Sequence, residues 1–397
     1  PSLASILCPA EGLVLATADE PLFHEAGVWL PTLQLWLVTS NRLDGPRVRV
    51  STIGLDGTVH DCSPQLEAAG FVMGNGGTAD GQGGAFLCSQ GLGTMGGSVW
   101  QLTPEAASST GPPCFAAERL EVRCPGGVCT PFNSPNDVCF HRTSGCARIP
   151  SQRTCAHTCL HRCYTLVSAR ARHPHRCIVF TDPSYGHEQG FRHGAGGRNT
   201  RAAVSTNSVW CLQPGPDGRW AVHALDHDFI KPNGCQLSPD ERTLYVSDTG
   251  YFDGEGGHDE SRPRCIYAFD LEMVDRGPDS PAADEAVGLG RSGECEFCAR
   301  EGHGCSLSAR NRRQIYELDE HDHGIPDGLK CDEEGRLYAG CADGVHVLSP
   351  AGELLGKLLV DGGVANLCFG GVDGQTLCML NERRALAVDL SVSGALS

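Results

Sequence analysis

Two segments of the chain place an oxygen-bearing side chain between a proline and a glycine, just before a strand-like run. One reads KPNGCQLSPDERTLYVSDTG over residues 231–250, and the other reads IPDGLKCDEEGRLYAGCADG over residues 325–344. Asn233 and Asp327 occupy the same place in the two segments, 12 and 11 positions before the tyrosine of a Leu-Tyr pair. An isolated Asn-Gly or Asp-Gly pair is typical of a plain turn, so it is the shared register that indicates a common site.

Two further segments carry an oxygen-bearing side chain at a comparable place. Asn136 lies in SPNDVCF and Glu25 lies in HEAGVW, each ahead of a strand-like run. Together with Asn233 and Asp327 they supply two carboxylates and two amide carbonyls, with no thiolate and no imidazole. Such hard oxygen donors suit Ca²⁺, with water in the remaining positions, and two negative charges balance one divalent cation. We therefore predict a Ca²⁺ site, with Mg²⁺, Mn²⁺ and Zn²⁺ as the alternatives.

The elements that must position these residues are copies of one strand–turn–strand unit. A third copy begins at SPNDVCF, and its second strand is CIVFTDPSYG, with Phe180 44 positions after Asn136. Weaker copies span residues 24–41, 71–91 and 364–381. Six such units fit the chain length, and blades of this kind bury both faces only in a closed ring. We predict an all-β, six-bladed β-propeller that is closed by its N-terminal and C-terminal strands and has a central metal-binding tunnel.

The composition agrees with a protein of strands and turns, and the charge disfavours several classes of partner. The 397 residues include 51 glycines and 24 prolines, which suits many tight turns. A net charge of −17 disfavours nucleic acid and anionic membrane surfaces, and no apolar run reaches the roughly 18 residues of a membrane span. The chain begins at Pro1 without a clear signal-peptide pattern, which is compatible with a secreted or a cytoplasmic protein.

We predict a single propeller over residues 1–397, interrupted by irregular insertions at about 142–176 and 275–309. The first insertion contains seven arginines and no acidic residue, which is foreign to so acidic a chain. A genuine loop and read-through of non-coding sequence are both compatible with it. Among the 22 cysteines, four lie where a strand takes a small apolar residue and are predicted to be buried free thiols: Cys88, Cys265, Cys331 and Cys368.

The chain resembles the gluconolactonase/regucalcin-like (calcium-dependent phosphotriesterase-like) superfamily, and most closely the fungal lactonohydrolases within it. The segments that carry the resemblance run from residue 23 to 381 outside the two insertions: FHEAGVW, NGG at 75–77, FNSPNDV, FTDPSYGHEQGF, KPNGCQLSPDERTLYVSDTG, HGIPDGLKCDEEGRLYAGCADGVHVLSPAG and VANLCFGG. The resemblance implies a six-bladed propeller with one calcium ion held by Glu25, Asn233 and Asp327. It implies Asn136 as a fourth ligand, or as a contact of the substrate and the metal-bound water.

The resemblance also implies hydrolysis of a sugar-type or pantoyl-type lactone, with the cation polarising the carbonyl. Asp327 is the predicted general base for the attacking water, and His323 and His24 are predicted to assist it. Other residues that open or close equivalent strands are predicted to contact the substrate together with Asn136: Asn75, Asp182 and Tyr185.

Two alternative functions use the same predicted site. A phosphotriesterase or another ester hydrolase would employ the same cation, since the sequence does not fix the shape of the pocket. A non-catalytic calcium-binding propeller would bind the metal without turnover. A serine hydrolase is disfavoured because the chain has no Gly-x-Ser-x-Gly elbow. The predicted partner is a small-molecule lactone, without nucleic acid or membrane.

Overall fold

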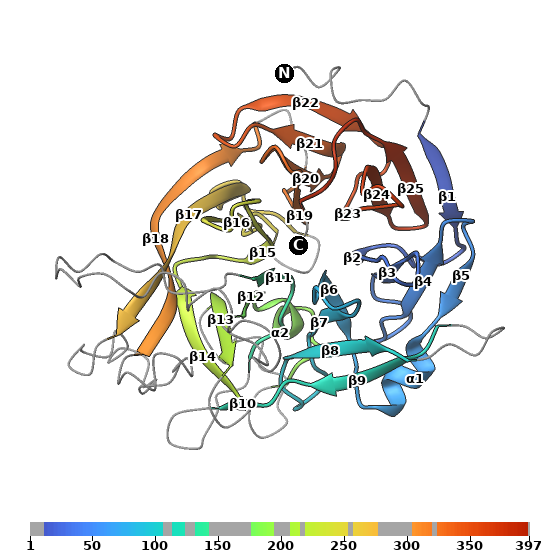
Figure 1. The fold of residues 1–397 in the computed structure, drawn as a ribbon, viewed down its shortest axis with the longest axis horizontal. Coiled ribbons are helices and arrows are strands. Elements are labelled where there is room, and N and C mark those ends of the chain that lie inside the picture. The colour runs from blue at the N-terminus through green and yellow to red at the C-terminus, as the bar shows by residue number, and fades with distance from the viewer. Residues whose placement is uncertain are drawn as a thin grey trace, which may run out of the picture.

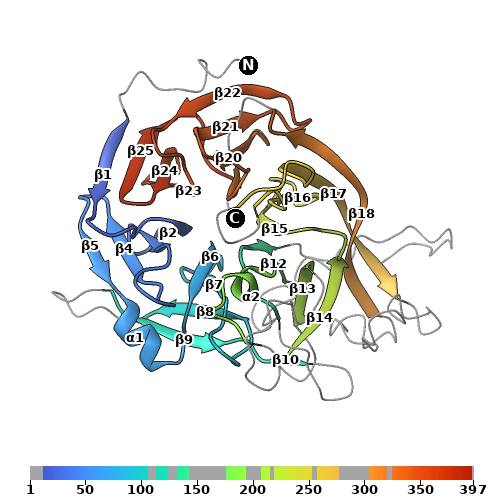
Figure 2. The same cartoon turned by 180° about the vertical axis from the view of Figure 1, so that it is seen from behind.

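Six β-sheets stand around a common axis and form a ring (Figure 1 and, from behind, Figure 2). The structure is a computed structural model and describes residues 12–105, 113–123, 132–142, 176–193, 207–214, 219–252, 257–276, 304–319 and 324–395. Each sheet is one blade, and one of its two edge strands lies nearest the axis. The fold is a six-bladed β-propeller, as the repeats predict.

The first three blades are built mainly from strands that follow one another in the chain. Blade 1 contains β2 (Glu25–Leu30), β3 (Leu35–Thr39), β4 (Val50–Gly54) and β5 (Val59–Asp61), and α1 (Ser63–Ala68) follows it. Blade 2 contains β6 (Gly74–Ala79), β7 (Ala85–Ser89), β8 (Ser98–Pro104) and β9 (Phe115–Arg119). Blade 3 contains β11 (Val138–His141), β12 (Cys177–Asp182), β13 (Ser208–Pro214) and β14 (Trp220–Asp226), with β10 (Val122–Arg123) parallel to β14 and α2 (Tyr185–Glu188) after β12.

The last three blades complete the ring. Blade 4 contains β15 (Pro232–Leu237), β16 (Thr243–Asp248), β17 (Cys265–Arg276) and β18 (Gly304–Glu317). Blade 5 contains β19 (Leu329–Cys331), β20 (Leu337–Cys341), β21 (Gly344–Leu348) and β22 (Leu354–Leu359). Blade 6 contains β23 (Asn366–Gly370), β24 (Thr376–Asn381) and β25 (Arg384–Asp389), and its outer strand is β1 (Leu13–Thr17).

The two ends of the chain close the ring in blade 6, which confirms the predicted closure. β1 pairs antiparallel with β25, and Leu13 lies opposite Ala387. A further bridge between Phe23 and Glu382 extends this contact toward the hub. The joint between the ends is therefore made by backbone hydrogen bonds as well as by packing, which protects a strand edge that would otherwise be open.

The hydrophobic core lies between neighbouring blades, one apolar cluster to each pair of facing sheets. One cluster joins Leu37 of blade 1 to Leu87 of blade 2, and another joins Trp36 of blade 1 to Leu380 of blade 6. Because each blade has two apolar faces, only the closed ring buries both. The four cysteines predicted as small apolar residues are buried and free, as expected: Cys88, Cys265, Cys331 and Cys368.

A β-bulge aims the key polar side chains at the axis. In blades 2 and 4, residues 75–76 and residues 233–234 each lie where the register slips against the second strand. The backbone hydrogen bonds show the same arrangement in blades 3 and 5. Residues 136–137 both bond to the backbone of Thr181 on the second strand, and residues 327–328 both bond to the backbone of Gly340. A bulge interrupts the alternation of a strand and re-aims a side chain. The repeated bulge therefore directs the first residue of each pair toward the hub.

The glycine after the site residue is required by the close approach of neighbouring blades. A Cβ added at Gly234 would lie 2.2 Å from the backbone carbonyl oxygen of Asp327 in the next blade. A Cβ added at Gly328 would lie 2.4 Å from the side chain of Asn366 in the blade after that. No side chain fits in either space, so the glycine of the Pro-x-Gly pattern is a packing requirement at the hub.

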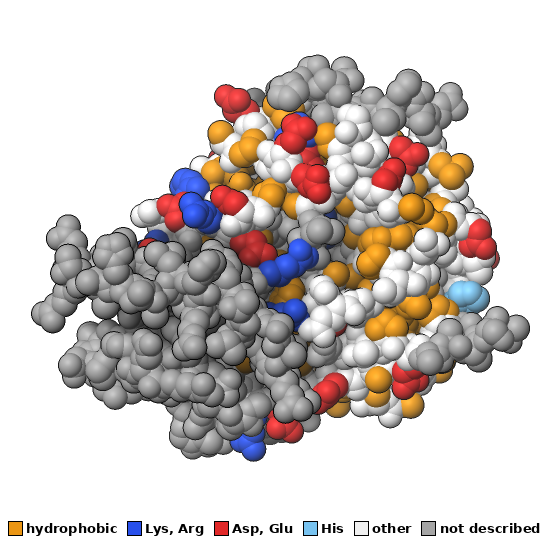
Figure 3. All heavy atoms as spheres, in the orientation of Figure 1, with side chains coloured by type: hydrophobic (Ala, Val, Ile, Leu, Met, Phe, Trp, Pro, Cys, Tyr) orange, Lys and Arg blue, Asp and Glu red, His pale blue; other side chains and the backbone are white. Residues whose placement is uncertain are grey.

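The predicted insertions fall largely outside the described residues. Residues 143–175 of the first and residues 277–303 of the second lie there, whereas residues 275–276 and 304–309 are strand in β17 and β18. The assignment of residues 1–397 to one domain stays a prediction. Within the described part of the chain, no helix is long and apolar enough to cross a bilayer, and acidic side chains are scattered over the face in Figure 3.

Gly234→Ala is expected to destabilise the propeller, because the new methyl group meets backbone that cannot move without shifting blade 5. The free energy of unfolding should fall by about 1–3 kcal/mol, as for other overpacked sites, measured by urea unfolding. Gly12→Ala is the matched control, since the nearest atom to its Cβ is 3.8 Å away. An equal stability of the two variants would contradict the packing requirement.

Candidate active site at the hub

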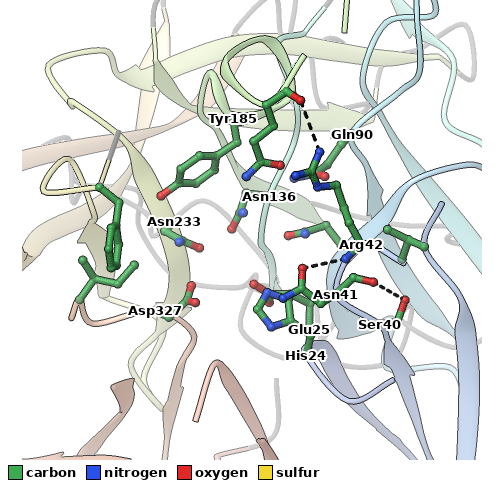
Figure 4. A pocket seen from close by; sticks show the side chains of 15 residues that line it. His24, Glu25, Ser40, Asn41, Arg42, Gln90, Asn136, Tyr185, Asn233 and Asp327 are labelled. Atoms are coloured by element: carbon green, nitrogen blue, oxygen red, sulfur yellow. Dashed lines mark hydrogen bonds between the residues drawn. The ribbon is translucent and has the colours of Figure 1, made fainter. Parts of the chain in front are cut away.

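A cavity of about 250 Å³ lies at the hub of the ring, where the inner strands of several blades begin. Oxygen-bearing side chains from four blades converge on it (Figure 4): Glu25, Asn136, Asn233 and Asp327. Three of these side chains are nearly fully buried, since Glu25 is 3%, Asn136 4% and Asn233 4% exposed. The structure thus brings together all four residues that the repeat register singles out.

Several oxygen atoms in this cavity are buried but unpaired. Among the described residues, none donates a hydrogen bond to Oδ1 of Asn75, Asn136 or Asp327. A buried acceptor without a partner costs free energy comparable to a lost hydrogen bond. All three atoms are hard oxygen donors that line the same cavity, so the cavity fits a group that accepts oxygen ligands.

The two carboxylates of the cavity carry charge that the described side chains compensate only in part. Burial raises the pKa of Glu25 well above its usual value, and the charge of Asp327 raises it further. Burial likewise raises the pKa of Asp327 to about 6. Both shifts reflect the cost of placing anions in a site of low dielectric, which a cation at this point would remove. Electrostatics therefore favours a bound cation between them.

His24 contributes a positive charge at the edge of the cavity. Its Nδ1 lies 2.7 Å from Oε1 of Glu382, which begins the turn between β24 and β25. Burial works against the protonated ring, but the hydrogen bond to Glu382 and the charges of Glu382, Glu25 and Asp327 raise the pKa of His24 to about 9. His24 is accordingly held by Glu382 on the rim, next to the carboxylate of Glu25.

Asn366 and Asn233 orient the two carboxylates from neighbouring blades. Asn366 opens β23 and donates from Nδ2 to Oε2 of Glu25 at 2.7 Å. The Asn233 amide lies between the Tyr185 hydroxyl and the Asp327 carboxylate (Figure 4) and lowers the pKa of both groups against the larger effect of burial. Tyr185, from α2, lines the cavity, and its contact with a substrate stays a prediction.

Asp182 occupies a different place from the other predicted substrate contacts. It is fully buried at the end of β12 and does not belong to the cavity lining among the described residues. Its carboxylate accepts the backbone N–H groups of Asn133 and Ser134 at 2.9 and 2.8 Å. Asp248, the equivalent residue at the end of β16, accepts the backbone N–H groups of residues 230 and 231 in the loop before Asn233. Asp182 therefore fixes the loop that precedes Asn136 and acts on the site indirectly.

The remaining predicted residues divide between the cavity and the undescribed part of the chain. Asn75 lines the cavity, whereas His323 lies outside the described residues. Sequence reasoning missed a polar wall that faces Tyr185 across the cavity (Figure 4): Ser40, Asn41, Arg42 and Gln90. Asn41 and Gln90 follow the second strands of blades 1 and 2, at the place where blade 4 has Thr249 in VSDTG. A comparison of the polar residues that follow the second strand of each repeat would therefore have predicted Asn41 and Gln90.

The donor set limits which cation the site can hold. Within the described ranges there is no cluster of three or more His, Cys, Asp or Glu side chains suited to a metal. Glu25 and Asp327 are two carboxylates, and the other donors are the amide oxygens of Asn136 and Asn233. A soft or borderline cation prefers thiolate or imidazole, whereas Ca²⁺ and Mg²⁺ take carboxylate, amide and water oxygens. The residues present fit a hard divalent cation.

Known proteins with related sequences include a gluconolactonase, lactonohydrolases and regucalcins. Residues 305–382 match the family model described as SMP-30/Gluconolactonase/LRE-like region. A gluconolactonase of Zymomonas mobilis is 30% identical over 269 residues, covering 66% of this chain and 52% of the relative. Lactonohydrolase oryL of Aspergillus oryzae is 27% identical over 174 residues, covering 44% and 35%. The chain matches about half or less of the length of these curated relatives.

Solved structures resemble the chain over nearly its full length. A gluconolactonase from Xanthomonas campestris has a TM-score of 0.57 at 23% identity, with 98% of this chain and 92% of that one covered. A calcium-binding protein, regucalcin from Agrobacterium tumefaciens, has a TM-score of 0.52 at 14% identity, with 96% of each chain covered. The structural likeness supports the fold, and the family match confirms the predicted resemblance to the gluconolactonase/regucalcin-like superfamily.

Asp182→Ala is expected to lower stability, because two buried backbone N–H groups lose their acceptor. The free energy of unfolding should fall by about 1–3 kcal/mol, measured by urea unfolding. Asp373→Ala is the matched control, since Asp373 also accepts a backbone N–H but in an exposed turn, where water replaces it. A variant with unchanged stability and a raised KM would instead assign Asp182 to the substrate.

Proposed function

We propose that this protein hydrolyses a small lactone in the hub cavity, with one divalent cation, Ca²⁺ in the first place, held by Glu25, Asn136, Asn233 and Asp327. The observation that carries the proposal is the convergence of these four oxygen-bearing side chains, from four blades, on one cavity with unpaired oxygens. The resemblance to gluconolactonases and lactonohydrolases supports the reaction class, and the resemblance to regucalcin supports the choice of calcium.

The chain's own residues divide the work of lactone hydrolysis. A cation bound here would supply a Lewis acid that polarises the lactone carbonyl. Asp327, with its unpaired Oδ1 facing the cavity, is the proposed general base, which takes a proton from the attacking water as the water oxygen bonds to the carbonyl carbon. The ring C–O bond then breaks, and the proton passes to the departing ring oxygen, which gives the open hydroxy acid.

The walls of the cavity suit a lactone with polar substituents. Gln90 and Arg42 offer an amide and a guanidinium group on one side, and Tyr185 offers an aromatic ring on the other. Asn75 adds an amide group to the lining. A volume of about 250 Å³ favours a small ring of the sugar or pantoyl type over a macrocycle. His323 remains a predicted assistant to Asp327, and Asn75 and Tyr185 remain predicted substrate contacts.

Removal of divalent cations is expected to abolish lactone hydrolysis and to be reversible. Chelator treatment followed by dialysis should leave less than about a hundredth of the activity, since the proposed carbonyl activation contributes several kcal/mol, and Ca²⁺ should restore it. Activity is followed by titration of the acid released from a panel of lactones, with a phosphotriester in parallel. Faster turnover of the phosphotriester would favour the alternative hydrolase, and calcium binding without any turnover would favour the non-catalytic propeller.

Asp327→Asn and Asn233→Ala are expected to lower kcat/KM by roughly 100-fold or more, as for loss of a general base or of a cation ligand. Asp327→Asn keeps the shape of the side chain, so a loss of activity reports its charge and basicity. Asp56→Asn is the control, because Asp56 is exposed in the turn between β4 and β5 and does not line the cavity. Full activity of both hub variants would overturn the residue assignment.

A further inference from the structure

Six hydrogen bonds join neighbouring blades at the hub, and each involves a residue at or beside the site position of its blade. In chain order, one blade donates and the next accepts: Thr39 Oγ1 to Asn75 O (3.1 Å), Gly76 N to Asn136 O (2.7 Å), Thr181 Oγ1 to Asn233 O (2.6 Å), Ser247 Oγ to Asp327 O (2.9 Å), Gly328 N to Ala365 O (2.9 Å) and Asn366 Nδ2 to Glu25 Oε2 (2.7 Å). We name this closed set the hub ring.

The shortest hydrogen bond of the Thr181 hydroxyl crosses to the next blade. The hydroxyl oxygen accepts the backbone N–H of Asp137 at 3.0 Å, and the carbonyl oxygen of Asn233, at 2.6 Å, is a much nearer acceptor for its proton than that of Asp137, at 3.4 Å. The carboxylate of Asp137 also accepts the N–H of Cys235 at 3.1 Å. The Asn233–Gly234 bulge is therefore tied to blade 3 on both sides, and Thr181 is fully buried.

In blades 1 to 5 the donor of the hub ring depends on the residue of the second strand, whereas in blade 6 the side chain of Asn366 on the first strand donates. Thr39, Thr181 and Ser247 lie opposite the site residue in blades 1, 3 and 4, and each donates from its hydroxyl. Blades 2 and 5 have Cys88 and Gly340 at that place, and there the N–H of the bulge glycine donates instead. A donor is thus supplied at every junction, whichever side chain the second strand carries.

Directional bonds are needed here because the packing between blades is not directional. Apolar contacts favour burial but leave the relative height of two blades loosely defined, whereas a cation site tolerates only small displacements of its ligands. Groups that orient the ligands from outside are the usual source of this precision. Thr181 and Ser247 hold the backbone of Asn233 and Asp327, which belong to adjacent blades.

We propose that Thr181 and Ser247 are positioning residues that set the spacing of the cation ligands Asn233 and Asp327 through the hub ring. The inference rests on the proposed function, since it concerns ligands of the proposed cation. Among the described residues that line the hub cavity, neither Thr181 nor Ser247 is found. Their contribution is to fix the backbone from which the two ligands project.

The test compares Thr181→Val with Thr181→Ser in the full chain. Valine keeps the shape of threonine without the hydroxyl, and serine keeps the hydroxyl. Ca²⁺ affinity is measured by calorimetry on chelator-treated protein, and Tm is measured without metal. Thr181→Val should bind Ca²⁺ roughly 10-fold or more weakly, as for other residues that orient metal ligands, and Thr181→Ser should retain the original affinity.

Thr52→Val is the matched control, because Thr52 is equally buried but lies on β4, the third strand of blade 1. It should leave Ca²⁺ affinity unchanged. A lower Tm for Thr181→Val with unchanged affinity would show a merely structural role and overturn the proposal, while the proposed function stands. Absence of Ca²⁺ binding in the unsubstituted protein would overturn both. If Thr181→Val does not fold, Ser247→Ala is judged by the same two outcomes.

Discussion

Two carboxylates meet at the hub of this propeller, with Glu25 buried and Asp327 partly buried. The charge of Asp327 raises the pKa of Glu25, and burial raises the pKa of both groups. Anions in such a place are stable only with a compensating charge and with hydrogen bonds to the charged forms. Asn366, Asn233 and the protonated rim residue His24 supply part of this compensation. A hard cation would supply the rest, and the unpaired oxygens of Asn136 and Asp327 face the space where it would lie.

The inner strands can approach one another closely at the hub because they contain β-bulges at equivalent positions. In blades 2 to 5 the site residue begins a bulge, and the next residue is a glycine in blades 2, 4 and 5. The glycine lets the backbone of one blade approach the next to within the distance of a hydrogen bond, as Gly234 and Gly328 show. Blade 3 differs, since Asp137 stands in the glycine position and its carboxylate accepts the N–H of Cys235 instead. The bulge at the start of the inner strand therefore both positions the proposed ligand and brings neighbouring blades into hydrogen-bond contact.

The division of roles between equivalent residues shows how a repeat protein builds an asymmetric site. Asp182 and Asp248 fix the loops before Asn136 and Asn233 in the same way. Thr39, Thr181 and Ser247 share a second position, and their hydroxyls face the following blade. Asn41 and Gln90, at a third position, reach the cavity rim. Structural, positioning and lining residues therefore follow one another within a few residues of each second strand.

The sequence by itself determined the repeat, the ring closure and the polar residue that begins each inner strand, because these depend on local patterns. The Pro-Asn-Gly and Pro-Asp-Gly segments, the alternating strands and the apolar cysteines such as Cys331 are all visible within about 20 residues. Only the tertiary structure decided what each side chain touches. Glu25 and Asn366 are 341 positions apart and meet only because the ring closes. Asp182 turned toward the loop at Asn133 rather than the cavity, since a β-strand end can face either way and the neighbouring loop offered two unpaired N–H groups. Contacts between blades depend on the height and twist of whole sheets, and no short stretch of sequence encodes these.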